Sequence, residues 1–174
     1  MDWYDMIFEL IDMRSFSNFW YWIGLAVLWS SAAHRVMGVP FDSIQRAKRN
    51  GGQAMIDLED LTRININRIL YISGVSGLWL LGFTSFLLTT LVIMGFVYHV
   101  EFAQAVFLMA FPMSILGLMS ISTAKKIQEN GMTGLVLCKQ LMRHRLYTQF
   151  LGMVSIFVTA IWGMYQNLSI SALG

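Results

Sequence analysis

The chain has 174 residues, of which 56% are hydrophobic and only 13% are charged. A soluble domain usually carries about 25% charged residues, so this composition excludes an ordinary soluble domain and indicates that lipid covers much of the surface. The net charge is +2, and the single cysteine, Cys138, excludes an intramolecular disulfide and an all-cysteine metal site.

The first 15 residues have the pattern of a short amphipathic helix, in which acidic and apolar side chains occupy opposite sides. The acidic residues that recur at helical spacing are Asp2, Asp5, Glu9 and Asp12. We expect this helix to lie on the outer surface of a membrane. This helix is either an anchor that fixes the tilt of the next helix or a docking surface for a protein partner. Its acidity adds weight to the second interpretation, because an anionic bilayer does not attract it.

Four segments are long and apolar enough to cross a bilayer, near residues 19–37, 69–97, 102–124 and 150–170. A span needs about 20 mainly apolar residues. A backbone in hydrocarbon must satisfy its own hydrogen bonds, which a few separate runs of this length achieve only as helices. The sequence therefore predicts an all-α integral membrane protein. We expect residues 1–174 to form a single membrane domain whose four spans pack as a four-helix bundle.

The basic residues predict the orientation of these spans. Eleven of the twelve Lys and Arg residues lie in two stretches, 35–68 and 125–145. Lys and Arg in short loops stay on the cytoplasmic side of a bilayer. The loops 38–68 and 125–149 are therefore expected inside the cell, and both termini outside.

Each cytoplasmic loop contains a glycine break, at residues 50–52 and 130–131, next to a helical pattern. We expect two cytoplasmic amphipathic helices, whose candidate interaction residues are Arg46, Lys48, Arg49, Lys139 and Arg143. They bind either the anionic inner leaflet, where each basic residue gains about 1 kcal/mol, or a cytosolic protein. Acidic residues interrupt the positive charge in these loops, so nucleic acid is not an expected partner.

Small residues recur at four-residue spacing in three of the predicted spans, in the third span at Ala110 and Ser114. Ser73 and Gly77 lie in the second span, and Ser155, Thr159 and Gly163 lie in the fourth. Helices in lipid associate by close backbone approach at such positions. These residues either pack the four spans against each other or face a partner subunit, which includes a second copy of the chain.

The sequence contains no recognisable catalytic motif, and the cores of the four spans contain no Asp, Glu, Lys or Arg. Ion or proton transport usually requires such residues, so we expect neither a transporter nor an enzyme, and no cofactor or metal. His34 and His144 are both expected near the inner face, where spacing allows a haem held by two histidines. Trp29 and Trp79 lie deeper in the predicted spans. Their side chains could contact a flat ring, so a quinone is the second ligand to consider.

A resemblance to a known family is carried by two segments, the opening MDWYDMIFELIDMRSFSNFWYW and, after it, WSSAAHRVMGVPFD. They resemble a small family of inner-membrane proteins from phototrophic and marine alphaproteobacteria. That family is recorded as a component of the SufBCD complex, which assembles iron–sulfur clusters. The similarity extends over most of the chain. It implies a bacterial inner-membrane location, with both termini in the periplasm, and transfers no catalytic residue.

These observations favour a non-catalytic accessory, scaffold or assembly subunit of a larger inner-membrane complex, either respiratory or photosynthetic. One alternative is a redox subunit that binds haem or quinone near the inner face. A third is an enzyme like the membrane glutathione transferases, which look similar in size, number of spans and outside termini. Residues 61–68 are partly similar to the Arg-rich motif that enters the second span of those enzymes, but they contain no histidine or glutamate.

Overall fold

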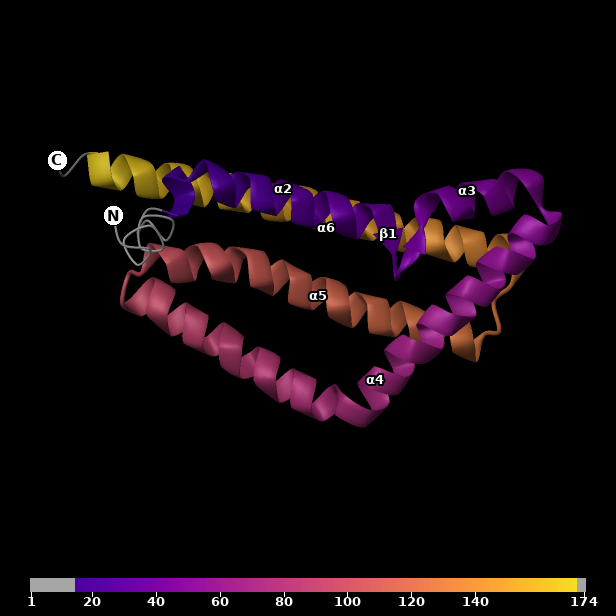
Figure 1. Cartoon of the computed structure of the whole chain (residues 1–174). Helices are drawn as coiled ribbons and strands as arrows, with labels where there is room; N and C mark the ends of the chain where they lie inside the picture. Colours follow the sequence, from indigo (N-terminus) through magenta and orange to yellow (C-terminus); the bar gives the residue numbers. More distant parts are fainter. Residues whose placement is uncertain (1–14, 172–174) are drawn as a thin grey trace, which may run out of the picture.

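A computed structural model describes residues 15–171, which are mainly helical (Figure 1). The α-helices of this part are α2 (Phe19–His34), α3 (Phe41–Asn50), α4 (Gly52–Val92), α5 (Glu101–Glu129) and α6 (Gly134–Ser171). A short 3-10 helix, η1 (Ser15–Ser17), precedes α2, and a π-helical turn, η2 (Ile93–Val97), follows α4. Two antiparallel strands, β1 (Arg35–Val36) and β2 (Val39–Pro40), connect α2 to α3. The predicted all-α class is confirmed.

Among residues 15–171, three helices are long and apolar enough to cross a membrane. They are Gly52–Val97, which is α4 with η2, then Glu101–Glu129, which is α5, and the Gly134–Ser169 part of α6. These helices contain the segments 69–97 and 102–124 and most of the segment 150–170, all three predicted as spans. The arrangement indicates a multi-pass membrane protein.

The segment predicted as the first span forms α2, which is shorter than expected. Its 16 residues make a helix about 24 Å long, against the roughly 30 Å of a bilayer core. The prediction that this helix reaches residue 37 is wrong, because the chain enters the β1–β2 hairpin at Arg35. Met37 (φ 51°) and Gly38 (φ 84°) both have positive φ, as the two central residues of a tight hairpin turn require.

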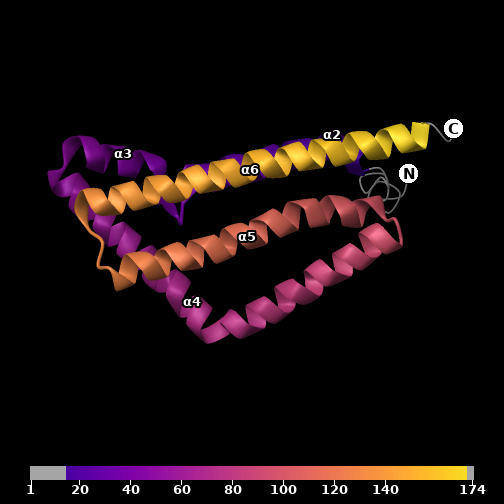
Figure 2. The same cartoon turned by 180° about the vertical axis from the view of Figure 1, so that it is seen from behind.

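The four long helices lie in the order α2, α6, α5, α4 (Figures 1 and 2). α2 packs along α6, α6 packs on α5, and α5 packs on α4. This open row differs from the predicted four-helix bundle. Residues 67–92 of α4 bury no side chain, so this part of α4 makes no packed contact that would close the row against α2.

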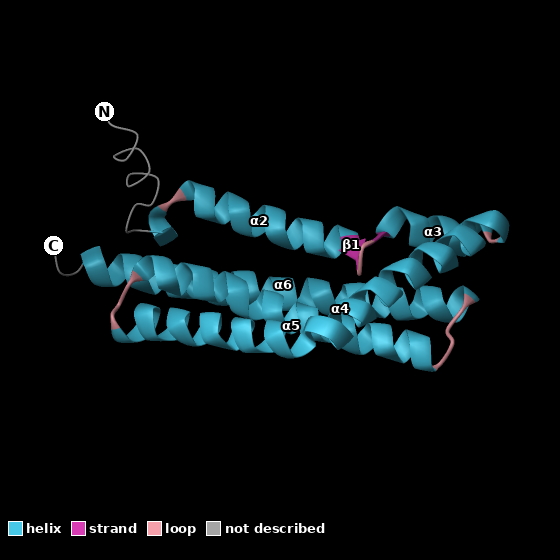
Figure 3. Ribbon diagram, turned by 60° about the horizontal axis from the view of Figure 1, so that its bottom comes forward, coloured by secondary structure: helices cyan, strands magenta, loops and turns pink. Residues whose placement is uncertain are grey.

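The main hydrophobic core lies at one end of the molecule, which we call the head. The head comprises the β1–β2 hairpin, α3, the first half of α4, the end of α5 and the start of α6 (Figure 3). Its buried core residues are Val36, Met37, Val39, Ile44, Ala47, Leu58, Ile66, Ala124, Ile127, Leu137, Cys138 and Leu141. α4 bends about midway along its length, and its buried residues, Leu58, Thr62 and Ile66, all precede residue 67 (Figure 1).

Both helical patterns predicted next to the glycine breaks are present. α3 ends at Asn50, at the predicted break, where Gly51 has a φ of 58°. The pattern after each break does not form a separate helix: it continues without interruption into the long apolar part of α4 and of α6. The segments that follow the two breaks are therefore continuous with the long helices.

Candidate functional site

The small residues of α6 line its contact with α2. Ser155 and Thr159 are buried, and Gly163 is buried beside them. A Cβ atom added to Gly163 would lie 3.3 Å from the Phe16 Cδ1 atom and 3.4 Å from the Trp22 Cζ2 atom. This part of the small-residue pattern is therefore occupied inside the chain, by the aromatic side chains that precede and begin α2.

The small residues of α4 have no such neighbour. A Cβ atom added to Gly77 would meet only the Ser73 hydroxyl of the same helix, at 3.8 Å, and Cβ atoms at Gly74 and Gly82 would meet nothing within 4 Å. The surrounding side chains are exposed, with Leu78 84% and Trp79 83% accessible. α4 thus presents an open apolar edge on which glycines leave the backbone accessible.

A buried polar cluster joins α5, α6 and η2 at the end opposite the head, which we call the turn end. Gln104 is only 1% exposed. Its Nε2 donates to the Gly95 carbonyl (2.7 Å), and its Oε1 accepts from Trp162 Nε1 (2.9 Å) and Gln166 Nε2 (2.7 Å). A Cβ atom on Gly95 would lie 3.0 Å from the Gln104 backbone nitrogen, so this close approach requires glycine. We call these four residues the Gln104 cluster.

α2 is attached to the turn end by further polar contacts. The Asn18 side chain caps α2 by accepting from the Trp20 N–H (3.0 Å). Glu101 accepts from the backbone N–H of Phe16 (2.8 Å), and the Tyr21 hydroxyl donates to the Ala105 carbonyl (3.1 Å).

The two histidines considered as haem ligands have different environments. His34 is exposed at the end of α2, whereas His144 is 2% exposed between α5 and α6. The Nδ1 of His144 lies 3.1 Å from the Thr123 hydroxyl, and its Nε2 lies 3.4 Å from the Ser120 hydroxyl. Both ring nitrogens thus face hydroxyl groups, and His144 would have to give up one of them to bind iron.

The basic candidates lie on the outside of the head. Arg46, Lys48 and Arg49 of α3 are exposed, while Ile44 and Ala47 of the same helix are fully buried in the head core. The apolar face of α3 is therefore used in packing and is not free to enter lipid. Lys139 and Arg143 are likewise exposed on α6, opposite the buried Leu137 and Leu141.

Arg145 joins α6 to the end of α2. Its Nε donates to the Ala33 carbonyl (3.0 Å), one of the last carbonyls of α2, which lack partners within the helix. Its guanidinium carbon also lies 3.6 Å from the centre of the Phe41 ring. One side chain therefore fixes α2, α3 and α6 at the border of the head.

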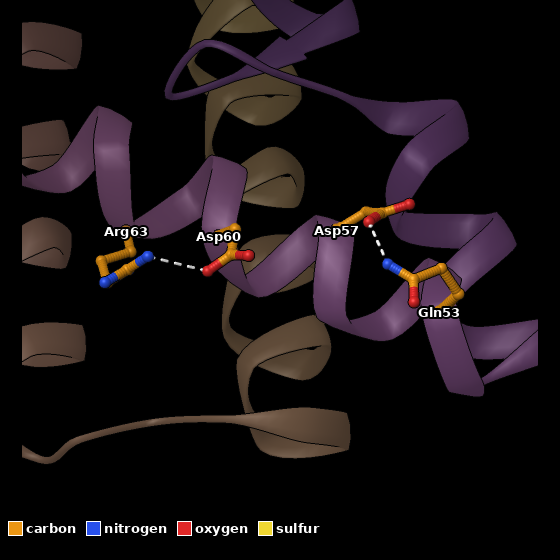
Figure 4. Close-up of polar contacts among 4 residues, drawn as sticks. All are labelled: Gln53, Asp57, Asp60 and Arg63. Carbon is orange, nitrogen blue, oxygen red and sulfur yellow. Dashed lines mark hydrogen bonds and ion pairs between the residues drawn. The ribbon is translucent and has the colours of Figure 1, made fainter.

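Acidic side chains of α4 interrupt the positive charge of the head. Asp57 accepts from Gln53 and Asp60 pairs with Arg63, both at 2.8 Å and both exposed to solvent (Figure 4). Exposed pairs of this kind contribute at most about 1 kcal/mol. Glu59 has a different role, because its Oε1 accepts from the Gly134 N–H (2.7 Å) at the start of α6, where a carboxylate stabilises the positive end of the helix dipole.

An apolar groove of about 670 Å³ lies along α2 and α6. Its lining includes Trp29, Ala33, Tyr147, Phe150 and Met153. The indole Nε1 of Trp29 is buried and has no hydrogen-bond partner within the described residues. Trp29 therefore borders the groove, whereas Trp79 is on the open edge of α4.

A second cavity, of about 400 Å³, lies in the head between α4 and the α5–α6 connection. Its lining mixes charged and amide side chains, including Glu59, Arg63 and Gln128. Within the described part of the chain, no group of three or more His, Cys, Asp and Glu side chains is arranged to hold a metal ion. The acidic candidates Asp2, Asp5, Glu9 and Asp12 lie outside the described residues.

Sequence reasoning missed three of the residues that organise these sites, namely Gln104, Glu59 and Arg145. Gln104 had a usable signal, because it is an amide inside a segment predicted to lie in lipid, where polar groups seek partners on other helices. Glu59 and Arg145 had no such signal, because their partners at Gly134 and Ala33 are distant in the sequence.

The fold defines an all-α protein with long apolar helices, as in multi-pass membrane proteins, and with a packed helical head at one end. Comparison with known protein families, with curated proteins and with solved structures found no match to this chain.

Proposed function

We propose that this chain is a four-span bacterial inner-membrane protein that acts as a non-catalytic accessory or assembly subunit of a larger complex. The observation that carries the proposal is the open edge of α4, where residues 67–92 bury no side chain and glycines expose the backbone. Helices of different subunits approach each other closely in lipid at such surfaces. We assign this edge to a partner subunit.

The proposal includes α2 as the fourth span. α2 is about 24 Å long and packs along the apolar half of α6. A helix that packs along a membrane-crossing neighbour is exposed to the same lipid as that neighbour. Phe19 and Trp20, which are 72% and 71% exposed at its start, suit the interface where aromatic rings settle.

The orientation follows from charge. All eleven Lys and Arg residues within 15–171 lie in the stretches 35–68 and 125–145, which form the head and its border. Positive residues are retained in the cytoplasm, so the proposal assigns the head to the cytosol and the turn end to the periplasm. The head then offers a charged, packed surface to cytosolic partners.

The test is purification of the tagged protein from its native membrane in mild detergent, followed by mass spectrometry of what accompanies it. Gly77→Leu alters the open edge of α4. Gly24→Leu is the matched control, because an added Cβ at Gly24 on α2, at the opposite edge of the row, meets nothing within 4 Å, and at Gly77 it meets only the Ser73 hydroxyl of its own helix. We expect the same membrane complex to accompany the wild type and Gly24→Leu, and to be lost with Gly77→Leu.

Recovery of the wild type alone, or equal recovery of the complex with both variants, would contradict the proposal. The absorption spectrum of the same preparation separates the redox alternative, because a Soret band that follows the protein through purification would establish a haem subunit.

A further inference from the structure

The apolar groove between α2 and α6 has the length of one bilayer leaflet. On α6 its lining extends from Leu146 to Ile156, and ten residue steps at 1.5 Å give about 15 Å, half of the roughly 30 Å hydrocarbon core. The lining is apolar at almost every position, and aromatic rings from Trp29, Tyr147 and Phe150 form part of it. These dimensions fit an acyl chain that enters from one leaflet.

The end of the groove nearer the head is marked by positive charge. Arg143 lies three residues before Leu146 and seven before Phe150, so it occupies the same face of α6 one turn beyond the groove. Lys139 lies four residues before Arg143 on that face, and both side chains are exposed. Arg145 borders the same end through its hydrogen bond to Ala33, a residue that lines the groove.

We infer that the groove is a specific site for an anionic phospholipid of the inner leaflet, with one acyl chain along α6 and the phosphate at Arg143 and Lys139. The inference rests on the orientation given in the proposed function, which sets the head in the cytosol. Basic residues beside helices on the cytoplasmic side attract anionic headgroups in this way. Charge complementarity favours this occupant over a membrane quinone, whose carbonyl would instead use the Trp29 N–H, which has no partner within the described residues.

The experiment uses the whole purified protein in detergent. Phosphatidylglycerol and phosphatidylcholine with identical acyl chains are added separately, and the bound lipid is measured by native mass spectrometry. We expect the wild type to prefer phosphatidylglycerol. Lys139→Gln with Arg143→Gln should weaken that preference by roughly 30-fold, because each basic residue near the inner leaflet gains about 1 kcal/mol. Lys125→Gln with Lys126→Gln is the matched control, because it removes two exposed charges from α5 and should leave the preference intact.

A second pair of variants tests the groove itself. Met153→Trp fills the groove and should abolish retention of both lipids. Ile161→Trp adds the same bulk at an exposed position of α6 that does not line the groove, and should have no effect. Equal retention of the two lipids by the wild type, equal behaviour of the paired variants, or recovery of a quinone in place of phospholipid would each overturn the inference. None of these outcomes changes the expected recovery of the partner complex. Failure of the lipid site can therefore be distinguished from failure of the proposed function.

Discussion

Replacing Gln104 by Met should destabilise the turn end without changing its shape. Met has nearly the length of Gln and is flexible enough to fill the same space. The substitution removes three hydrogen bonds, to Gly95, Trp162 and Gln166. Bonds between helices in membranes average about 0.6 kcal/mol, with a maximum of about 1.7. Three such bonds give a loss of about 2 kcal/mol, and at most about 5, in the free energy of unfolding.

The assay is equilibrium unfolding in mixed detergent micelles, followed by circular dichroism, in which about 2 kcal/mol corresponds to roughly a 30-fold change in the unfolding constant. Gln128→Met is the matched control, because Gln128 is exposed near the other end of the same helix. It should change the free energy by less than about 0.5 kcal/mol. A double-mutant cycle with Trp162→Phe should be non-additive, because both changes remove the same bond. Equal stability of the two Met variants, or full additivity in the cycle, would refute this account of Gln104.

Other substitutions test the remaining contacts. Gly163→Leu should lower the free energy of unfolding by about 1–3 kcal/mol through overpacking, whereas Gly77→Leu should leave it unchanged in the same titration. Arg145→Lys should cost about 1–2 kcal/mol, since an ammonium group cannot both bond the end of α2 and stack on a ring as a guanidinium does; unchanged thermal stability in detergent would contradict this role. For topology, cysteines placed at Asp5 and Lys48 in a cysteine-free protein should react with an impermeant reagent only at the first position, and periplasmic labelling of the second would reverse the proposed orientation.

The long helices and α3 were predictable because their signals are local. Apolar runs of sufficient length, together with glycine breaks at residues 50–52 and 130–131, determine where helices extend and where they stop. The end of α2 was not predictable in the same way. The hairpin requires Met37 to adopt a positive φ, which is uncommon for a residue with a side chain. It also needs a small residue at Gly38, where an added Cβ atom would lie 3.1 Å from Asn65 Oδ1 of α4.

The buried faces were harder to predict than the helices. Leu58, Leu61 and Ile64 have the spacing of one apolar helix face, but the structure buries Leu58 with Thr62 and Ile66 and leaves Ile64 61% exposed. A helix that packs against neighbours on more than one side buries whichever residues face them, including a threonine. The open row of helices was hard to predict for the same reason. The order in which helices pack depends on contacts between segments, which no single segment encodes.

The uninterrupted course of α6 has a mechanical consequence. Its 38 residues form a rod about 57 Å long, with Leu137 and Leu141 fixed in the head core and Thr159 fixed against α2. A change in the tilt of α6 in lipid therefore moves its two ends relative to each other. About 10° of tilt displaces one end from the other by roughly 10 Å. A change in membrane thickness, or a neighbour that leans against α2, would therefore reposition the charged surface of the head as a rigid lever.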